Sequence, residues 1–519
     1  MNNKYILTHD LGTSGNKTAL YDFKLNLIAQ AKTDYPIYYP KPGWAEQDAS
    51  DYWNSVIKNT KKLLQETGIS PDNIQGMIFD TQGNCTIPID EHGNPLMRSI
   101  NWLDTRAGPL IQKAFRGVIK ISGYGARRLL RHLKITGGAP SSTGKDPISH
   151  ILWIKKNKPE IYDKTYKFLN VKDFVIFKCT KKAIVSRCLG HSSWLMDTNP
   201  EVFDWSDKLL KKFKIDRNKL PEIKKSTEVA GNLTPEAAQE LGIKPKIPVF
   251  VGSVDWMAAS IGSGAIDENQ IHINIGTAAW VAAHVYHRKK DIFHYVGPVS
   301  TEDNYLCISK QETGAACLDW IKEQMFKDEI SKYGENSNEI YDKLTEIALK
   351  SEPGASNLLF GPWMFGERSP INDPNARGGF FNLFIAHDRS DMLRSVLEGV
   401  AYNLKWSLQF VEKLSAKNET INFIGGGAKS DFWCQIIADV LDRNINQMED
   451  PSLGSTKGSA IVALVGLGVL NNLSEAIPLV KVEKTYKPNP ENREIYDKLF
   501  AEFIKLYKNQ KKMLKTLNA

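Results

Sequence analysis

The sequence predicts an α/β protein of two related domains, and three observations support this prediction. The chain has 519 residues, more than a single hydrophobic core usually organises. Its N-terminal part alternates between strand-like and helix-like patterns. A strand that runs into a glycine–threonine turn occurs near residue 10 and again near residue 275, which indicates two units of similar build.

The N-terminal part predicts a strand meander followed by a helix. The expected strands span residues 5–10, 17–23 and 27–35. Residues 49–68 then carry apolar side chains at helical spacing, with Asp48 or Ser50 as the N-cap and Gly68 at the end. Strand-like sequence resumes at 73–81. This alternation is typical of the α/β class.

The same order of patterns returns in the second half of the chain. Residues 247–255 predict a strand that ends at Asp255, and a helix of small residues follows. Residues 271–278 predict a further strand and its glycine–threonine turn. Later helices are expected at 391–414, 431–442, 455–468 and from about residue 491 onward. The predicted boundary lies near 245–253, which gives domains of residues 1–250 and 251–519.

The composition of the chain argues against membrane, secreted and nucleic-acid-binding proteins. Hydrophobic residues make up 42% of the chain and charged residues 24%, as in an ordinary globular protein. No apolar run is long enough for a membrane span, and the N-terminus lacks the apolar core of a signal peptide, so we expect a cytoplasmic protein without a membrane partner. The net charge of +8 suits an anionic ligand, but no nucleic-acid signature accompanies it. The six cysteines are expected to be buried, reduced thiols.

The first candidate phosphate site is the turn at residues 10–17, D-L-G-T-S-G-N-K. Its glycines let backbone N–H groups approach an anion closely. Thr13 adds a hydroxyl and Lys17 a positive charge. Asp10 suits Mg²⁺, which keeps several waters and uses few carboxylates. The alternative, with equal weight from this turn alone, is an ordinary hairpin turn.

Two further glycine turns are candidates for binding phosphate. Gly276 and Thr277 follow a predicted strand, and residues 425–430, G-G-G-A-K-S, lie between a strand and a helix. Neither has the spacing of a P-loop or of a dinucleotide-binding fingerprint.

Asp255 is the candidate base. It lies where a strand ends among small residues, where a carboxylate can be partly desolvated and can take a proton from a hydroxyl. The alternative is that Asp255 caps the helix that follows, and its position alone does not separate the two.

Taken in order, these motifs resemble the FGGY carbohydrate kinase family, especially its xylulose-kinase-like branch, over nearly the whole chain. The resemblance also includes P-G-W-A-E-Q-D at 42–48, N-W-L-D-T-R at 101–106, G-S-V-D at 252–255, G-E-R-S-P-I-N-D-P-N-A-R-G at 366–378, L-E-G-V-A-Y at 397–402 and G-S-T-K-G-S-A at 454–460. No single motif is enough to assign the family, but the full set of motifs in this order is specific to it.

The resemblance implies two actin-like, ribonuclease-H-type ATPase domains with a cleft between them, and phosphorylation of a small sugar by ATP and Mg²⁺. By this likeness Asp255 is the catalytic base, and Asp10 and Asp255 serve the metal. The implied cofactor-binding residues are Asp10, Thr13, Ser14, Lys17, Gly276, Thr277, Gly314, Gly426, Ala428 and Lys429. Closure of the domains would exclude water.

At the implied substrate-binding positions, this sequence carries other residues than xylulose kinases do. Gly83 and Asn84 stand where xylulose kinases carry Met and His, and Trp256 stands where they carry Asn. Gly83 opens space, Asn84 can donate and accept hydrogen bonds, and Trp256 can stack on a sugar. Together with Trp102, which either walls the pocket or packs in the core, they are the expected substrate-binding residues. The sugar is therefore left open among ketopentoses such as xylulose, related ketoses and polyols.

A basic segment at 115–134 is a second difference from the family that the chain resembles. We interpret this segment as a lid or a subunit-contact helix. A homodimer is one arrangement it would serve.

Two alternative functions are weighed against the sugar kinase. An actin- or chaperone-type protein that changes conformation with its nucleotide would share the phosphate turns, but it would need a peptide-binding domain for which too few residues remain. An inactive kinase is disfavoured because Asp10, Thr13, Asp255 and Thr277 are all present.

Overall fold

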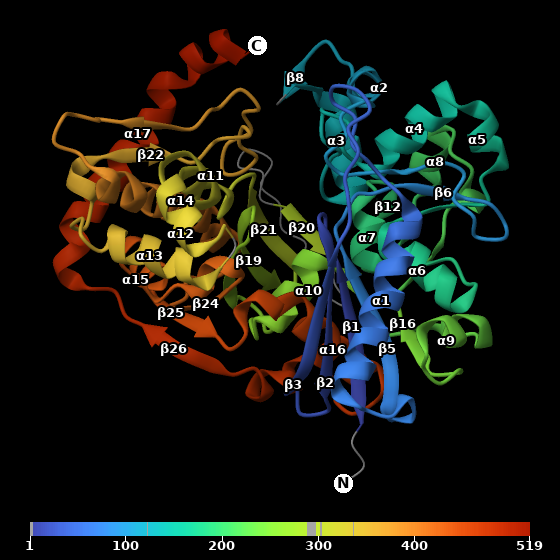
Figure 1. The fold of residues 1–519 in the computed structure, drawn as a ribbon. Coiled ribbons are helices and arrows are strands. Elements are labelled where there is room, and N and C mark those ends of the chain that lie inside the picture. The colour runs from blue at the N-terminus through green and yellow to red at the C-terminus, as the bar shows by residue number, and fades with distance from the viewer. Residues whose placement is uncertain (1–3, 122, 288–296, 301–303, 336, 519) are drawn as a thin grey trace.

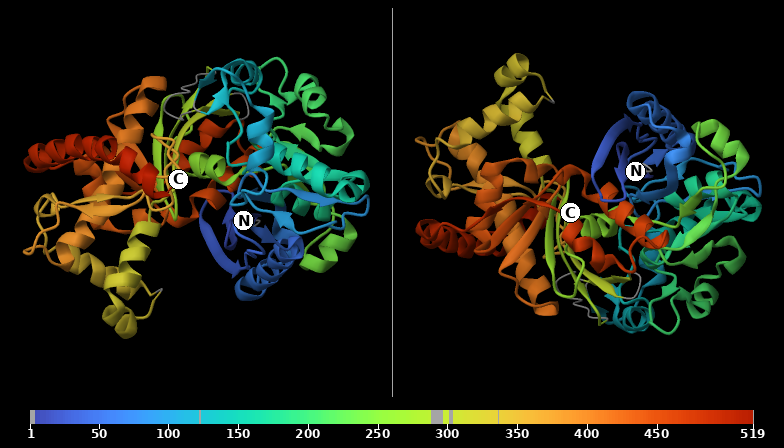
Figure 2. Two further views of the ribbon diagram at one scale, coloured as in Figure 1. Left: turned by 90° about the horizontal axis from the view of Figure 1, so that it is seen from above. Right: turned by 90° about the horizontal axis from the view of Figure 1, so that it is seen from below.

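The computed structural model describes residues 4–518 except 122, 288–296, 301–303 and 336. These residues form two lobes, each built on a seven-stranded sheet (Figure 1). Views from above and below keep the N-terminal lobe, drawn blue to green, beside the C-terminal lobe, drawn yellow to red (Figure 2).

The first sheet has the strand order β15-β16-β5-β1-β2-β3, and β17 also pairs with β5. Its strands are β1 (Tyr5–Leu11), β2 (Gly15–Asp22), β3 (Leu27–Asp34), β5 (Ile74–Thr81), β15 (Val229–Asn232), β16 (Pro248–Phe250) and β17 (Ser253–Val254). The three predicted N-terminal strands and the strand at 73–81 are confirmed.

The second sheet has the strand order β20-β21-β19-β18-β24-β25-β26. Its strands are β18 (Ile271–Ile275), β19 (Ala279–Val285), β20 (Gly297–Ser300), β21 (Tyr305–Gln311), β24 (Thr420–Ile424), β25 (Asn444–Met448) and β26 (Val482–Tyr486).

The two sheets share one topology. In the first, β1 pairs antiparallel with β2 and parallel with β5, while β2 pairs antiparallel with β3 and β5 parallel with β16. In the second, β18 pairs antiparallel with β19 and parallel with β24, while β19 pairs antiparallel with β21 and β24 parallel with β25. The prediction of two related α/β units, each with the actin-like order, is confirmed.

The helices of the N-terminal lobe are α1 (Ala49–Thr67), α2 (Gly108–Ala114), α3 (Ala126–Thr136), α4 (Pro147–Asn157), α5 (Pro159–Lys164), α6 (Val171–Thr180), α7 (Arg187–Ser192), α8 (Asp207–Phe213) and α9 (Pro235–Leu241). Of these, α1 and α6 pack on the strands of the first sheet. The sequence predicted α1 with both of its ends. Asp48 is the N-cap and accepts a hydrogen bond from the backbone N–H of Ser50, and Gly68 ends the helix in the left-handed conformation.

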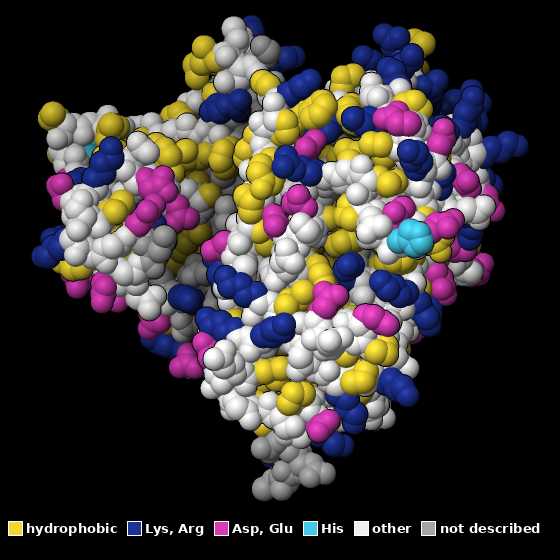
Figure 3. Space-filling model, turned by 45° about the vertical axis from the view of Figure 1, so that its right-hand side comes forward, with side chains coloured by type: hydrophobic (Ala, Val, Ile, Leu, Met, Phe, Trp, Pro, Cys, Tyr) yellow, Lys and Arg dark blue, Asp and Glu magenta, His cyan; other side chains and the backbone are white. Residues whose placement is uncertain are grey.

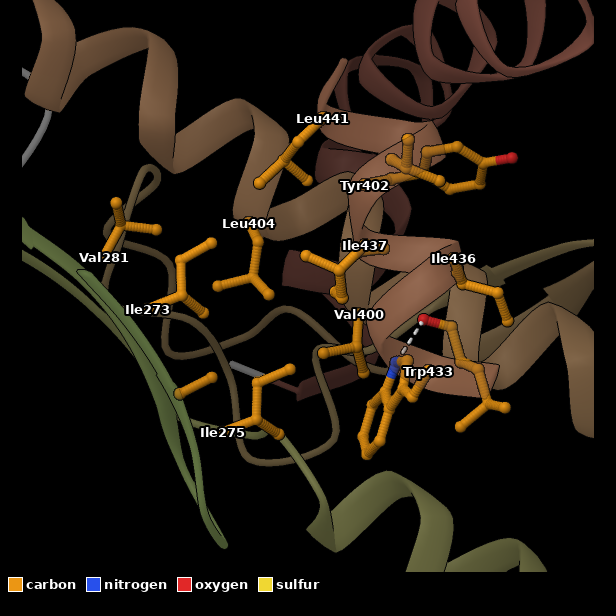
Figure 4. Packing of buried hydrophobic residues seen from close by; sticks show 14 of the residues in the cluster. Ile273, Ile275, Val281, Val400, Tyr402, Leu404, Trp433, Ile436, Ile437 and Leu441 are labelled. Atoms are coloured by element: carbon orange, nitrogen blue, oxygen red, sulfur yellow. Dashed lines mark hydrogen bonds between the residues drawn. The ribbon is translucent and has the colours of Figure 1, made fainter. Parts of the chain in front are cut away.

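The helices of the second half pack on the second sheet or between the sheets. They are α10 (Asp255–Gly262), α11 (Ala316–Met325), α12 (Lys327–Tyr333), α13 (Asn338–Ala348), α14 (Arg389–Leu414), α15 (Asp431–Leu441), α16 (Gly454–Gly466) and α17 (Arg493–Asn518). Figure 4 shows Ile273 and Ile275 of β18 facing Val400 and Leu404 of α14. These contacts bury the apolar face of the sheet.

Short two-stranded pairs join the loops at the rim of the lobes. They are β4 (Glu46–Gln47) with β7 (Ser99–Ile100), β6 (Ile87–Ile89) with β10 (Lys167–Leu169), β8 (Lys120–Ile121) with β9 (Tyr124–Gly125), β11 (Ile184–Ser186) with β14 (Glu222–Lys224), β12 (Met196–Asp197) with β13 (Asp204–Trp205), and β22 (Leu359–Gly361) with β23 (Gly379–Phe381).

The lobes meet along α10 and α16, which cross at glycines. A side-chain carbon at Gly262 would overlap the backbone carbonyl of Gly454, and one at Gly458 would overlap that of Ala258. Helix α16 also lies against β1 and β5 of the first sheet, where the Ser459 hydroxyl donates to Asp80 at 2.7 Å. The glycines therefore let two helix backbones approach closely at the centre of the molecule.

Three remaining expectations concern the chain as a whole. All six cysteines are buried, as predicted. Among the helices that the structure describes, none is both long and apolar enough to cross a membrane. The domain boundary between residues 250 and 251 stays a prediction.

The helix crossing gives a test of stability. We expect Gly458→Ala to lower the free energy of unfolding by about 1–3 kcal/mol, because the added methyl group collides with a backbone that cannot move independently. Chemical denaturation of the full chain measures this. The control is Gly379→Ala, where the nearest atom to the new carbon lies at 3.4 Å. Equal stability of both variants would contradict the tight crossing.

Candidate active site

A cavity of about 2220 Å³ lies between the lobes and takes its walls from both. Figure 3 shows the surface hollowed between the two lobes. We call it the interlobe cavity. The predicted site residues that line it are Asp10, Thr13, Ser14, Lys17, Gly83, Asn84, Trp102, Asp255, Trp256, Gly276, Thr277, Gly426 and Lys429. Residues from distant parts of the sequence thus converge on one space.

Two predicted nucleotide residues do not line the interlobe cavity. Gly314 lies behind its wall, where its N–H donates to the carbonyl of Thr277 at 2.8 Å. Ala428 is fully buried, and its carbonyl accepts from the Gln447 side chain at 2.7 Å. Their neighbours Ala315 and Gly427 line the cavity instead.

The first glycine turn is at once a hairpin turn and part of the cavity wall. It joins β1 to β2, and the Gly12 N–H donates to the Gly15 carbonyl at 2.9 Å. The Tyr35 hydroxyl donates to the Gly12 carbonyl at 2.6 Å, and Trp102 Nε1 donates to Thr13 Oγ1 at 2.9 Å. The two readings of this turn are therefore compatible, because the hairpin holds Thr13 toward the cavity.

The other two glycine turns belong to the second sheet. The turn at Gly276 follows β18 and is closed by a hydrogen bond from its N–H to the Ala278 carbonyl at 2.9 Å. The turn at 425–430 follows β24 and leads to α15, whose N-cap is Ser430. A side-chain carbon at Gly426 would meet no atom within 4 Å, so this turn leaves open space.

Asp255 is the first residue of α10 and lines the interlobe cavity. Its Oδ1 accepts the N–H of Trp256 at 2.7 Å, and no other hydrogen bond reaches its carboxylate from the described residues. Val254, not Asp255, is the N-cap of α10, which disfavours the capping alternative. Burial raises the pKa of Asp255 to about 6, although the Lys310 ammonium lowers it.

Three carboxylates lie near one another at the meeting of the lobes. Asp10 and Asp80 are paired in register on β1 and β5, and Asp10 also raises the pKa of Asp255. Burial raises the pKa of Asp80 well above its usual range, and the nearby Asp10 carboxylate raises it further. No group of three metal-ligating side chains is assembled among the described residues. Asp10 and Asp255 still fit Mg²⁺, which needs only one or two carboxylates and keeps its waters.

The predicted substrate residues form one side of the interlobe cavity. Asn84 adopts the left-handed conformation (φ 63°) and donates to Asp146 Oδ1 at 3.2 Å. Gly83 packs against Val254 and leaves room beside Trp256. Trp102 lines the cavity, its indole N–H donates to Thr13 Oγ1, and the side chain also packs against the core of the first lobe, so its contact with substrate stays a prediction.

Sequence reasoning missed a set of charged residues around these side chains. They are Lys145, Asp146, Lys310, Glu312 and Arg368, all of which line the interlobe cavity. One signal was available, since Lys310 is a charged residue in a strand, β21, whose other residues are uncharged and buried. Arg368 stood inside a quoted family motif but carried no assigned role. The positions of Lys145 and Glu312 depend on tertiary contacts that the sequence does not display.

The motif at 101–106 divides into two parts. Trp102 and Leu103 line the cavity, whereas Asp104 and Arg106 are buried. The Arg106 guanidinium contacts Asp104 at 2.7 Å and Glu46 at 2.8 Å, and it lies 3.6 Å from the centre of a Trp44 ring. This clamp fixes the loop at 42–48 against the segment that carries Trp102.

The basic segment at 115–134 forms part of the cavity wall. It contributes the hairpin β8–β9 and most of α3, while Ser122 lies outside the described residues. Tyr124, Leu129 and Leu133 line the interlobe cavity. Arg127 and Arg131 are exposed on the other side of the helix. The lid and subunit-contact interpretations stay predictions.

Comparison with known proteins identifies the family. A model of the N-terminal domain of the FGGY family of carbohydrate kinases matches residues 5–262, and a model of the C-terminal domain of that family matches residues 273–467. The chain belongs to the FGGY family of carbohydrate kinases. It is a sugar kinase, which confirms the predicted enzyme class and displaces the chaperone-type alternative.

Relatives of this kinase cover its whole length. It is 30% identical to a xylulose kinase of Staphylococcus epidermidis over 511 residues, 98% of this chain and 97% of that protein. It is 28% identical to a gluconokinase of Bacillus licheniformis, over 97% of this chain and 95% of that protein. Crystal structures of a gluconate kinase and a xylulose kinase, both from Lactobacillus acidophilus, match with TM-scores of 0.85 and 0.87 at 27% and 26% identity, over 98% and 99% of this chain and 98% and 100% of theirs. The predicted two-domain fold is confirmed, and the relatives' names leave the sugar open.

Proposed function

We propose that this kinase transfers the terminal phosphoryl group of ATP to a hydroxyl of a small sugar or polyol, with Asp255 as the general base. One observation carries the proposal. Asp255 faces the same interlobe cavity as the glycine turns near Gly12, Gly276 and Gly426. A base and three anion-binding turns on one enclosed space are what phosphoryl transfer to an alcohol requires.

Asp255 has the properties of a base that works near neutral pH. Its carboxylate is held by a single backbone N–H, so it keeps acceptor capacity for a substrate hydroxyl. Burial raises its pKa to about 6, which makes it a stronger base than an exposed aspartate while it stays ionised at pH 7. Nearby Lys310 and Lys17 favour this ionised form.

The donor phosphates would lie against the glycine turns. The Thr277 hydroxyl and the backbone at Gly426, with Lys429 nearby, offer donors on the C-terminal lobe, and Thr13 and Lys17 offer them on the N-terminal lobe. Mg²⁺ held through Asp10 would neutralise charge on these phosphates. Movement of the lobes about the α10–α16 crossing would bring the two sets together and exclude water.

The acceptor would lie between the two tryptophans. Trp102 and Trp256 offer flat faces for the carbon skeleton, and Asn84 offers hydrogen-bonding groups for a hydroxyl. Relatives named xylulose kinase and gluconokinase support a small sugar or sugar derivative of five or six carbons. A ketopentose such as xylulose, a related ketose or a polyol remains the acceptor class that the sequence predicts.

The role of Asp255 has a direct test. We expect Asp255→Asn to lower kcat by roughly 10²- to 10⁴-fold, the usual contribution of a positioned base, with the Kd for ATP unchanged. A coupled assay of ADP formation across a panel of ketopentoses, ketohexoses and polyols measures turnover, and calorimetry measures ATP binding. Asp163→Asn, an exposed aspartate outside the cavity, is the control. Undiminished turnover in Asp255→Asn would remove Asp255 from the chemistry.

The pH profile gives a second test. The base acts only when ionised, and its pKa is raised to about 6, so kcat/KM should fall tenfold per unit as the pH drops below about 6. An unperturbed aspartate would hold activity down to about pH 4. Circular dichroism at each pH excludes unfolding as the cause. An acid limb near pH 4 would contradict the enclosed position of this carboxylate.

Asn84 tests the acceptor side. Asn84→Gly keeps the left-handed backbone conformation but removes the amide, so we expect the KM for the acceptor to rise about tenfold with the KM for ATP unchanged. Initial rates with each substrate varied in turn measure both constants. Asn382→Gly is the matched control, since Asn382 also has a positive φ but is exposed and outside the cavity. A parallel rise of both KM values would make Asn84 a structural residue.

A further inference from the structure

We propose that the acceptor carries a carboxylate, and that Lys145, Lys310 and Arg368 bind it, so that this kinase acts on a sugar acid. We call these three residues the cationic cluster. The inference rests on the proposed function and narrows its acceptor from small sugars in general to acidic ones.

Two lysines reach the acceptor side of the interlobe cavity from opposite lobes. Lys145 precedes α4 in the N-terminal lobe, and its ammonium lies 6.0 Å from the centre of a Trp102 ring. Lys310 lies on β21 in the C-terminal lobe, and its ammonium lies 5.1 Å from the centre of a Trp256 ring. Both therefore stand beside the tryptophans between which the acceptor would lie.

Neither ammonium group has a partner in contact. No carboxylate of the described residues lies within 4.0 Å of Lys145 or Lys310, and neither donates a hydrogen bond to a described residue. Burial lowers the pKa of both lysines, that of Lys310 to about 8, so each is held partly out of water. An enclosed ammonium without a contacting anion is costly for the empty protein, and a bound anion removes that cost.

The nearest acidic side chain from the N-terminal lobe is already engaged elsewhere. Asp146 Oδ1 accepts from Asn84 and from Trp194 Nε1 at 2.9 Å, and Asp146 Oδ2 accepts the Ser141 N–H at 2.5 Å. These donors hold the Asp146 carboxylate in place. It therefore fixes Asn84 and does not reach the adjacent Lys145 ammonium.

The nearest acidic side chain from the C-terminal lobe is engaged as well. Glu312 Oε1 accepts a hydrogen bond from Arg368 Nε at 3.0 Å and forms an ion pair with Arg368 Nη2 at 2.8 Å. Burial alone would raise the pKa of Glu312, but the Arg368 and Lys145 charges hold it below its usual range, so Glu312 stays ionised and paired. Arg368 Nη1 donates to no described residue, and 40% of the Arg368 side chain remains exposed. Arg368 thus offers a further donor to the same space.

The only other carboxylate that strongly affects Lys310 is the base itself. Asp255 raises the pKa of Lys310 while burial lowers it. Lys310 therefore lies close enough to the base and to the Arg368–Glu312 pair to feel the charges of both. An acceptor with its reacting hydroxyl at Asp255 can therefore direct a carboxylate toward Lys310, with Lys145 and Arg368 as further donors. A neutral sugar in the same position would leave Lys145 without an anion.

The test compares acceptors that differ only in charge. Purified kinase is assayed for ADP formation with matched pairs of a sugar acid and its polyol: D-gluconate and D-glucitol, D-xylonate and xylitol, D-erythronate and erythritol. We expect the acid of at least one pair to have a kcat/KM about 10- to 100-fold above that of its polyol, the range of one or two charge-assisted hydrogen bonds. Calorimetric titration of the same compounds, without nucleotide, should show binding of the acid that weakens with salt.

Variants assign the effect to the cationic cluster. Lys145→Met and Lys310→Met should each lower the acid-to-polyol ratio of kcat/KM about tenfold or more, and Lys145→Arg should restore most of it. The control is Lys62→Met on α1, which is exposed and outside the cavity and should leave the ratio at the wild-type value. The ratio separates specificity from a general loss of activity, which would lower both members of a pair alike.

Three outcomes of these assays would contradict the inference. Turnover of polyols or neutral sugars with no preference for acids would overturn the inference while the proposed function stands. An unchanged ratio in both methionine variants with a raised KM for ATP would also overturn it, because the ammonium groups would then serve the donor phosphate. Absence of turnover with every acid, polyol and ketose would remove the proposed function and this inference together.

Discussion

The close crossing of α10 and α16 is the constraint on which the site depends. At Gly262 and Gly458 the two helix backbones touch, because neither position has a side chain to hold them apart. Both helices begin at the interlobe cavity, α10 with Asp255 and α16 with Gly454. The crossing therefore sets where the carboxylate of Asp255 stands relative to the glycine turns of both sheets.

The duplicated sheet topology explains why two similar glycine turns line the same cavity. In each lobe the first hairpin of the sheet, β1–β2 or β18–β19, places a glycine turn at one edge of the sheet. The lobes join with these edges on the same cavity. The two lobes nevertheless contribute different side chains to the cavity, since the proposed acceptor residues Asn84 and Trp102 come from the first lobe.

Some charged side chains of the cavity have hydrogen-bond or ion-pair partners, and others do not. Asp146 and Glu312 are held by fixed donors, and burial raises the pKa of Asp80. Asp255 and the Lys145 ammonium keep unmet capacity inside the same enclosed space. A buried charged group without a partner lowers the stability of a protein, and such groups are found where ligands bind and react.

The sequence by itself determined the local elements and the family. Periodicity and backbone preferences within a few residues predict helix α1 with its caps at Asp48 and Gly68, the strands that lead to Asp10 and Asp255, and the glycine turns. Only the tertiary structure decided which charges share the cavity, and it alone placed Lys145 and Lys310 beside the tryptophans. The reason is physical: a local pattern encodes the conformation of its own segment, whereas the loss of water around a charge depends on segments far away in the chain.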